Sequence, residues 1–130
     1  VCISGAYNDA DHALIEQAHG RLPRVLVQIA PLDAEFTKYF SNVFNALRIV
    51  FANQFYDVCE AAGADYQVVK NAAAMRSNIG LHYLECNKEF RAFGGNCLPK
   101  DTLAFAEFVR LIGVDAPLFR TIVNINASIK

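Results

Sequence analysis

No stretch of this sequence is apolar over the roughly 20 residues that a membrane span requires, and no charged-then-apolar leader opens it. Basic residues do not cluster, and 12 Lys and Arg are balanced by 13 Asp and Glu, for a formal net charge of −1. A nucleic-acid-binding domain would carry a basic patch. We therefore expect a cytoplasmic protein with neither a membrane nor a nucleic acid among its partners.

The sequence also has no C-x-x-C pair. Its four cysteines, Cys2, Cys59, Cys86 and Cys97, are scattered along the chain. This spacing argues against a zinc site, and with no secretory leader it favours a reducing compartment. We expect no metal site.

Apolar residues, in contrast, are in excess. They make up 54% of the chain without glycine, whereas soluble domains have roughly 45–50% with glycine included. The 130 residues suffice for one domain with its own core. The excess therefore predicts a surface covered by a partner subunit or by the rest of a larger protein. The immediate start on a short β run at residues 1–5 also leads us to expect a fragment.

Residues 1–30 are predicted to form a βαβ-like unit. Strands at 1–4 and 25–29 flank a helix that Asp9 or Asp11 can cap. One such unit cannot cover both faces of a parallel pair, so we expect the edge of a larger sheet.

Two histidines, His12 and His19, lie seven residues apart on the helix of this unit. No third ligand is spaced to join them. We expect solvated surface side chains rather than metal ligands.

An uninterrupted helical pattern follows Pro31. Apolar residues recur at three and four positions until Gly63, which predicts one helix over residues 33–62, capped by Asp33. At 1.5 Å per residue this helix would be roughly 45 Å long, whereas a compact domain of this size is roughly 36 Å across. We expect it to pack against a second copy of itself or to form a spine between domains, with its aromatic residues in a core or interface.

Near the start of this helix, Lys38 and Asn42 lie four apart and therefore on one face. A Lys and an Asn on an otherwise apolar face can stabilise an oxyanion, the first by charge and the second by its amide N–H. They can equally form a solvated stripe, and the pattern alone leaves both readings open.

The remaining chain is predicted to be helical with one long loop at 81–96, a length typical of functional or mobile loops. The expected helices are a helix capped by Asp65 that runs to about Met75 and is ended by the turn to Gly80, one from Pro99 to Ile112, and one from Pro117 onward.

Cys97 is the candidate nucleophile. Pro99 fits the first turn of a helix, which places Cys97 just before the helix N-terminus. Unpaired N–H groups and the positive dipole end stabilise a thiolate there, and Lys100 adds to this effect.

Two neighbouring features support that interpretation. Gly94 and Gly95 leave room for a bulky substrate beside the backbone, and Asp101, four residues after Cys97, can hold a water against a group bonded to sulfur. The alternative is a buried, inert Cys97 after an ordinary tight turn.

Residues 94–101, Gly-Gly-Asn-Cys-Leu-Pro-Lys-Asp, resemble the catalytic motif Gly-Gly-x-Cys-(Phe/Leu)-Pro-Lys-Asp of the UDP-glucose/GDP-mannose dehydrogenase family. Three further segments agree with that family in the same order: residues 35–42 (Glu-x-x-Lys-x-x-x-Asn), 59–65 (Cys-Glu-x-x-Gly-Ala-Asp) and 79–83 (Ile-Gly-x-x-Tyr/Phe). The resemblance spans about residues 32–130.

The resemblance implies a mainly α fold, a helical domain built on one long helix and similar to the C-terminal domain of 6-phosphogluconate dehydrogenase. Residues 1–30 would be the remnant of a Rossmann-type NAD-binding domain, and residues 31–130 a central dimerisation and catalytic domain. A homodimer would form through the helix at 33–62. The sequence contains no Gly-x-Gly-x-x-Gly, so NAD would be bound mainly by a domain outside this chain, and we expect no turnover by the isolated chain.

The family oxidises the C6 alcohol of a nucleoside-diphosphate sugar to a carboxylate with two NAD⁺. Carried over, Cys97 would form a thiohemiacetal and then a thioester, and Asp101 would orient or deprotonate the hydrolytic water. Lys38 and Asn42 would stabilise the oxyanion and position that water. Lys100 would lie beside the cofactor.

For substrate binding, the resemblance implies that Tyr83, Phe93 and Gly94 line the sugar-nucleotide pocket. The chain departs from many relatives at Asn78, where they have Arg, and in a longer loop at 84–92. These departures leave the sugar open among UDP-glucose, a UDP-N-acetyl sugar and GDP-mannose.

Cys86, Lys88 and Arg91 are the loop residues that replace smaller ones in relatives. Lys88 and Arg91 are candidates for phosphate binding or for a solvated loop charge, and both readings stay open.

Two other functions remain. The domain can act as a dimerisation module with an inert Cys97, or as a thiol hydrolase. The second is weak, because His82, the nearest histidine in sequence, stands in no recognisable pairing with Cys97.

Overall fold

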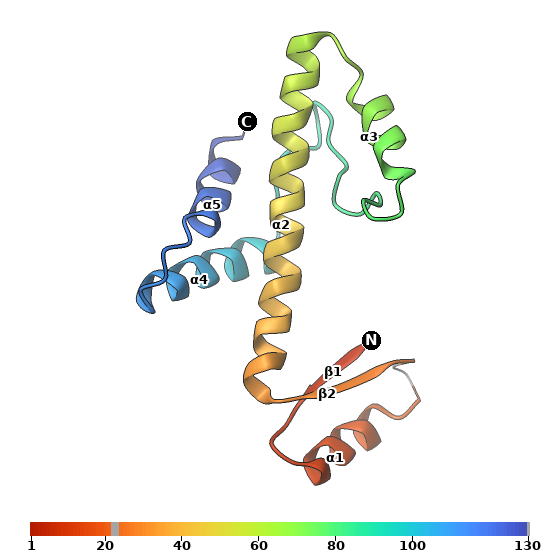
Figure 1. The fold of residues 1–130 in the computed structure, drawn as a ribbon, viewed down its shortest axis with the longest axis vertical. Coiled ribbons are helices and arrows are strands. Elements are labelled where there is room, and N and C mark those ends of the chain that lie inside the picture. Colours follow the sequence, from red (N-terminus) through yellow and green to blue (C-terminus); the bar gives the residue numbers. More distant parts are fainter. Residues whose placement is uncertain (22–23, 130) are drawn as a thin grey trace. The chain divides into compact units, whose positions relative to one another are not determined.

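The computed structural model of the chain describes residues 1–21 and 24–129 and is mainly helical (Figure 1). Its elements in order are β1 (Cys2–Gly5), α1 (Asp9–His19), β2 (Leu26–Ile29), α2 (Pro31–Ala62), α3 (Tyr66–Ala74), α4 (Cys97–Leu111) and α5 (Leu118–Ser128). The predicted fold class, a helical protein built on one long helix with a small βαβ unit at its N-terminus, is confirmed. The chain divides into two compact units, residues 1–41 and 42–130, so the boundary falls within α2.

The first unit contains a parallel pair of strands. β1 and β2 pair from Cys2 with Leu26 to Gly5 with Ile29, and α1 connects them. The predicted cap was wrong, because Asn8 is the N-cap of α1 and its side chain accepts a hydrogen bond from the Asp11 N–H at 2.9 Å. Asn caps as well as Asp does, and Asp9 and Asp11 in the first turn favour the positive end of the helix dipole.

His12 corrects a second prediction. The sequence suggested a solvated side chain, but His12 is buried, and its Nδ1 lies 2.8 Å from the buried Ser4 Oγ of β1. An imidazole can fill a helix–strand interface when one nitrogen has a partner, since buried polar groups need hydrogen bonds. His19 is exposed, as predicted.

The long helix begins at Pro31, two residues before the predicted start at Asp33, so Asp33 lies in its first turn and does not cap it. Proline suits the first helical position, because an N–H at that position would make no hydrogen bond within the helix. The helix ends at Ala62, and Gly63 follows with a φ of 75°. It is 32 residues long, which corresponds to about 48 Å at 1.5 Å per residue.

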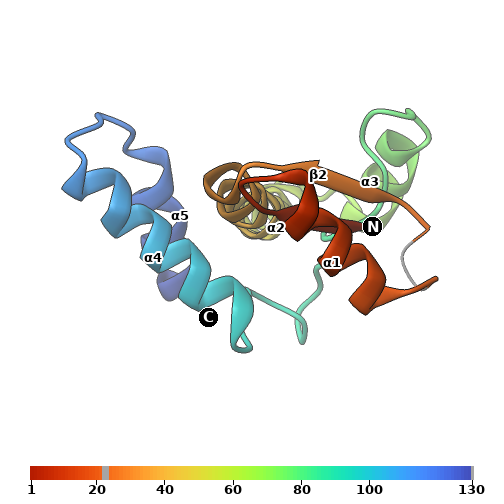
Figure 2. The same cartoon turned by 90° about the horizontal axis from the view of Figure 1, so that it is seen from below.

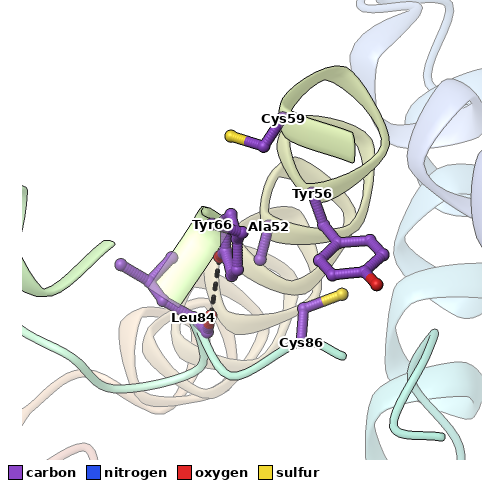
Figure 3. Close-up of a cluster of buried hydrophobic side chains, with 6 residues drawn as sticks. All are labelled: Ala52, Tyr56, Cys59, Tyr66, Leu84 and Cys86. Atoms are coloured by element: carbon purple, nitrogen blue, oxygen red, sulfur yellow. Dashed lines mark hydrogen bonds between the residues drawn. The ribbon is translucent and has the colours of Figure 1, made fainter. Parts of the chain in front are cut away.

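Within the second unit, α3 lies on one side of α2, and α4 and α5 lie on the other (Figure 1, Figure 2). Each side has a buried cluster. The first joins the end of α2 to α3 and to the loop after it, through Ala52, Tyr56, Cys59, Tyr66, Leu84 and Cys86 (Figure 3). The Tyr66 hydroxyl donates to the Leu84 carbonyl at 2.7 Å, which fixes the loop to α3.

Asp65 caps α3 as predicted, accepting from the Gln67 and Val68 N–H groups. The predicted end of this helix at about Met75 is confirmed, since α3 ends at Ala74 with Met75 as its C-cap. The capping role predicted for Gly80 was wrong, because tight turns separate Gly80 from the helix end. The Arg48 guanidinium of α2 donates to the carbonyls of Ile79 and Gly80 at 2.9 and 3.2 Å, so the turn is held by a distant residue.

The second cluster brings α2, α4 and α5 together. Its buried members are Val43, Ala46, Val50, Phe93 and Ile122. Phe105 of α4 meets Phe119 of α5 edge to face, with ring centroids 4.8 Å apart. The first of these two helices begins at Cys97 itself, not after it as predicted, and α5 begins at Leu118 with Pro117 as its N-cap. The irregular segment predicted before α4 is confirmed, with no helix or strand assigned between Met75 and Asn96.

None of the helices in the described part of the chain combines the length and the apolar character that crossing a membrane requires.

Candidate active site

Cys97 is the first residue of α4 and is exposed. All four cysteines lie in the described part of the chain, and the other three are buried or half-buried. The helix beyond Cys97 runs for 15 residues, so its free N–H groups and dipole present a positive end to this sulfur. An exposed thiol at a helix start is accessible to an electrophile.

Asp101 lies one turn after Cys97 and is almost fully buried, at 3% exposure. Both of its carboxylate oxygens have donors. The Asn42 amide of α2 donates to Oδ2 at 2.6 Å, and the Lys100 ammonium lies 3.2 Å from Oδ1. Asn42 and Asp101, which are 59 positions apart in sequence, are therefore brought together. The Asp101 carboxylate is held in one orientation on the same face of α4 as Cys97.

Lys38 lies on α2 one turn before Asn42 and is exposed. Its ammonium is 5.8 Å from the centre of the Tyr39 ring. Lys38 belongs to the first compact unit and the other predicted catalytic residues to the second, so its part in the site stays a prediction.

The three predicted substrate-binding residues occupy different environments. Tyr83 is 47% exposed and has a φ of 61°, an unusual backbone conformation for a residue with a side chain. Gly94 is exposed. The ring of Phe93 is buried in the second cluster, so Phe93 offers a ligand its backbone rather than an open ring.

Sequence reasoning missed the role of Arg91. It was weighed as a phosphate ligand or a solvated charge, but its guanidinium pairs with both Asp57 oxygens at 2.8 and 2.9 Å and donates from Nε to Asn53 at 2.8 Å. It also lies over the Tyr56 ring, 5.0 Å from the centre. Arg91 thus anchors the loop to α2. The signal was Asn53 itself, a polar residue on the apolar face of a long helix.

Asn126 was the second omission. This α5 side chain accepts from the Phe93 N–H and donates to the Phe93 carbonyl, at 2.7 and 3.0 Å. Nothing in the local sequence of α5 indicates which loop it meets.

The buried groups behind this loop keep their protons to unusually high pH. Burial raises the pKa of Tyr66 to about 12, and the neighbouring Cys86 adds to that rise. Burial likewise raises the pKa of the Cys86 thiol, with the Arg91 charge opposing. Cys86 is therefore a core residue with an inert thiol.

No group of three or more His, Cys, Asp or Glu within the described residues could hold a metal ion. An open depression of about 470 Å³ lies beside the end of α2, lined by Tyr56, Glu60, Gly63, Ala64, Asp65, Tyr66, Gln67 and Asn87. None of the predicted site residues lines it.

The family model described as "UDP-glucose/GDP-mannose dehydrogenase family, central domain" matches residues 32–128, most of the chain. The chain belongs to this family. The predicted resemblance is therefore confirmed.

Individual relatives agree. The chain is 30% identical over 95% of its length to a UDP-glucose 6-dehydrogenase of Bacillus subtilis, and 30% identical over 97% to a GDP-mannose 6-dehydrogenase of Azotobacter vinelandii. It covers 26% and 29% of those two proteins, so it spans less than a third of the length of these relatives.

Solved structures carry the same fold. A UDP-glucose dehydrogenase from the hyperthermophilic archaeon Pyrobaculum islandicum matches 97% of this chain at a TM-score of 0.87 and 30% identity, and 28% of that protein is covered. A ternary complex of GDP-mannose dehydrogenase from Pseudomonas aeruginosa matches 97% at a TM-score of 0.56 and 25% identity, with 29% covered. Relatives thus include both UDP-glucose and GDP-mannose enzymes, which agrees with a nucleotide-sugar dehydrogenase and leaves the sugar open.

Proposed function

We propose that this chain supplies the catalytic cysteine of an NAD-dependent nucleotide-sugar 6-dehydrogenase of the cytoplasm, which oxidises the C6 alcohol of a nucleoside-diphosphate sugar to a carboxylate. The observation that carries the proposal is the Asn42–Asp101 hydrogen bond of 2.6 Å, one turn along α4 from an exposed Cys97. Membership of the family gives this arrangement its chemistry.

Cys97 acts as the nucleophile. Its sulfur bonds to the carbonyl carbon of the aldehyde-level intermediate, and the π electrons move to oxygen, which gives a thiohemiacetal. Loss of a hydride from the thiohemiacetal carbon to NAD⁺ and of its hydroxyl proton would leave the carbon as a thioester, which water hydrolyses to release the carboxylate and regenerate the thiol. The positive end of α4 favours both the sulfur anion and the developing oxyanion.

Asp101 orients the hydrolytic water and accepts its proton. Its carboxylate has a fixed direction because Asn42 and Lys100 hold one oxygen each. Asn42 keeps a second amide hydrogen and an oxygen for the water or the oxyanion. In this proposal the Lys38 ammonium supplies a further positive charge to the oxyanion.

NAD⁺, held mainly by parts of the protein outside this chain, would accept the hydride in both oxidation steps. Two features fit such a cofactor. The parallel β1–α1–β2 unit has the connectivity of dinucleotide-binding sheets, and the exposed Lys100 side chain at the start of α4 suits an anionic group. The isolated chain is expected to show no turnover.

The substrate pocket is proposed to include exposed Tyr83, exposed Gly94 and the Phe93 backbone. The nucleotide sugar is UDP-glucose, a UDP-N-acetyl sugar or GDP-mannose. Turnover of the full-length protein with each of the three discriminates among them.

Cys97→Ser in the full-length protein tests the catalytic assignment. A serine hydroxyl is a weaker nucleophile at neutral pH, so net NADH release with the nucleotide sugar should fall by at least about 10³-fold. Cys86→Ser, which changes a buried thiol, is the matched control. Wild-type turnover by Cys97→Ser would overturn the proposal.

A second role, dimerisation, is favoured by the outer face of α2. Phe44, Phe51, Phe55 and Val58 are 39–61% exposed and share one face of the helix. Such a patch is typical of a protein interface. We propose that a second copy of the chain covers it. If Cys97→Ser leaves turnover intact while the chain dimerises, the domain is a dimerisation module only.

A further inference from the structure

The three residues before Gly94 are tied to two different helices. Arg91 and Ala92 meet Asn53 of α2, and Phe93 meets Asn126 of α5. Only Gly94, Gly95 and Asn96 separate these attachments from Cys97. The position of the sulfur therefore depends on how firmly residues 91–93 are held.

Asn53 is almost fully buried, at 1% exposure, and all its polar atoms are engaged. Its Oδ1 accepts from Arg91 Nε at 2.8 Å and from the Ala92 N–H at 3.0 Å, and its Nδ2 donates to the Ile49 carbonyl at 2.8 Å. Ala92 has a φ of 58°, which costs about 1 kcal/mol or more for a residue with a Cβ. The hydrogen bond from the Ala92 N–H to Asn53 Oδ1 offsets part of that cost.

Asn126 holds Phe93 by two bonds at once, accepting from its N–H and donating to its carbonyl. These two hydrogen bonds resemble those between paired residues of neighbouring β-strands. The Asn126 carboxamide can make both because it carries a donor and an acceptor side by side. The Phe93 ring is buried beside Ile122 on the same helix, so both the backbone and the ring of Phe93 are fixed on α5.

We propose that Asn126 is a positioning residue for the reaction: with Asn53 as the second anchor, it fixes residues 91–93 and so sets the place of the Cys97 sulfur relative to Asp101. Neither asparagine belongs to the Gly-Gly-x-Cys motif. The proposal rests on the proposed function, since it assigns the support for that nucleophile. A displacement of about 1 Å at a reacting atom can lower a rate about 10²-fold. Loss of the Asn126 hydrogen bonds to Phe93 should therefore lower kcat.

Asn126→Ala and Asn126→Asp in the full-length protein test this. The aspartate keeps the acceptor for the Phe93 N–H but places an oxygen against the Phe93 carbonyl. Asn124→Ala is the matched control, because Asn124 is exposed two residues earlier on the same helix. The readouts are kcat and KM for the nucleotide sugar, and the rate of iodoacetamide alkylation at Cys97, resolved by peptide mass spectrometry.

Both Asn126 variants should lower kcat about 10- to 100-fold, with KM within about threefold of wild type, and change the Cys97 alkylation rate at least about threefold. Asn124→Ala should keep kcat, KM and the Cys97 alkylation rate within about twofold of the wild-type values. If Asn126→Ala does not fold, the isosteric Asn126→Asp decides by the same criteria.

A purely structural role makes a different prediction. The thermal midpoint would fall, while kcat per folded enzyme and the alkylation rate stay within about twofold of wild type, and that result would overturn the proposal. The two hypotheses can be overturned separately. Full activity of Cys97→Ser would overturn the proposed function, whereas an inactive Cys97→Ser together with a normal Asn126→Ala would overturn only the positioning role of Asn126.

Discussion

The carboxylate of Asp101 is buried and relies on Asn42 for one of its donors. Asn42→Asp replaces that donor by an acceptor of the same shape and sets two carboxylates against each other. At pH 7 we expect a loss of about 2–4 kcal/mol of unfolding free energy, because a buried charge loses its partner. The thermal midpoint of the full-length protein measures it, with Gln54→Glu, an exposed amide-to-acid change on the same helix, as the control.

The same variant has a pH signature. Two adjacent carboxylates share a proton, which raises the folded-state pKa of the introduced group above its unfolded value of about 4. A raised folded pKa contributes stability below the unfolded pKa and loses it as the pH rises through the folded value. Asn42→Asp should therefore approach wild-type stability toward pH 4, and an equal deficit at pH 4 and pH 7 would contradict the pairing.

Tyr66 offers a second titration. Burial raises its pKa to about 12 from an ordinary 10.0, so the neutral phenol contributes stability in full below pH 10 and loses it between pH 10 and 12. Tyr66→Phe removes the bond to Leu84 and should cost about 1 kcal/mol at pH 7, but the difference from wild type should shrink over that alkaline window. Chemical denaturation at several pH values measures it, and a difference that stays constant from pH 7 to pH 12 would contradict the raised pKa.

Among the elements, α4 depends on the turn that delivers the chain to Cys97. Gly95 has a φ of 76° and Gly94 does not have a positive φ, while a Cβ at either position would meet open space. Gly95→Ala should therefore cost about 1–2 kcal/mol through backbone strain alone, and Gly94→Ala much less. Thermal midpoints of the two variants compare them directly, and equal losses would refute the strain argument.

Elements were predictable from sequence where a local rule decides them. The spacing of apolar residues predicted α2, and Asp65 was identified as the cap of α3 because Asp is a favoured N-cap residue. The end of α3 near Met75 was also predicted, but the contact that holds the Gly80 turn was not, because Arg48 lies far away in sequence. Likewise, His12 was assigned to the surface because Ser4 lies on another element.

The candidate site follows the same division. Cys97 and Asp101 were recognisable from one motif, since a helix start and an i, i+4 spacing are local features. Asn126 was not, because a side chain that binds the backbone of a distant loop leaves no periodic signal in its own segment. The role of Arg91 was missed because its partners, the Asn53 and Asp57 side chains, lie on α2, far away in sequence. The resemblance to the family predicted that Asn42 acts together with the cysteine motif. The Asn42–Asp101 hydrogen bond is the contact that joins this residue of α2 to the motif.

For the molecule as a whole, the apolar excess of the sequence reappears as exposed aromatic side chains on α2. Phe51 is 56% exposed and contacts Phe55, with ring centroids 5.5 Å apart. If a second copy covers this face, Phe51→Glu places a charge in an apolar interface and should weaken dimerisation by at least about 2 kcal/mol, about 30-fold in Kd. Sedimentation equilibrium of the full-length protein over a concentration series measures that shift.

The matched control for this substitution is Met75→Glu, which introduces the same charge at a residue that is 87% exposed and lies beyond the end of α3. It should leave the association unchanged, because the position lies off the aromatic face. The mutated face also contains no residue of the Cys97 motif, so a monomeric Phe51→Glu that keeps its thermal midpoint isolates the loss of the interface from a loss of folding. An unchanged Kd for the dimer of Phe51→Glu would contradict the proposal that a second copy covers this face.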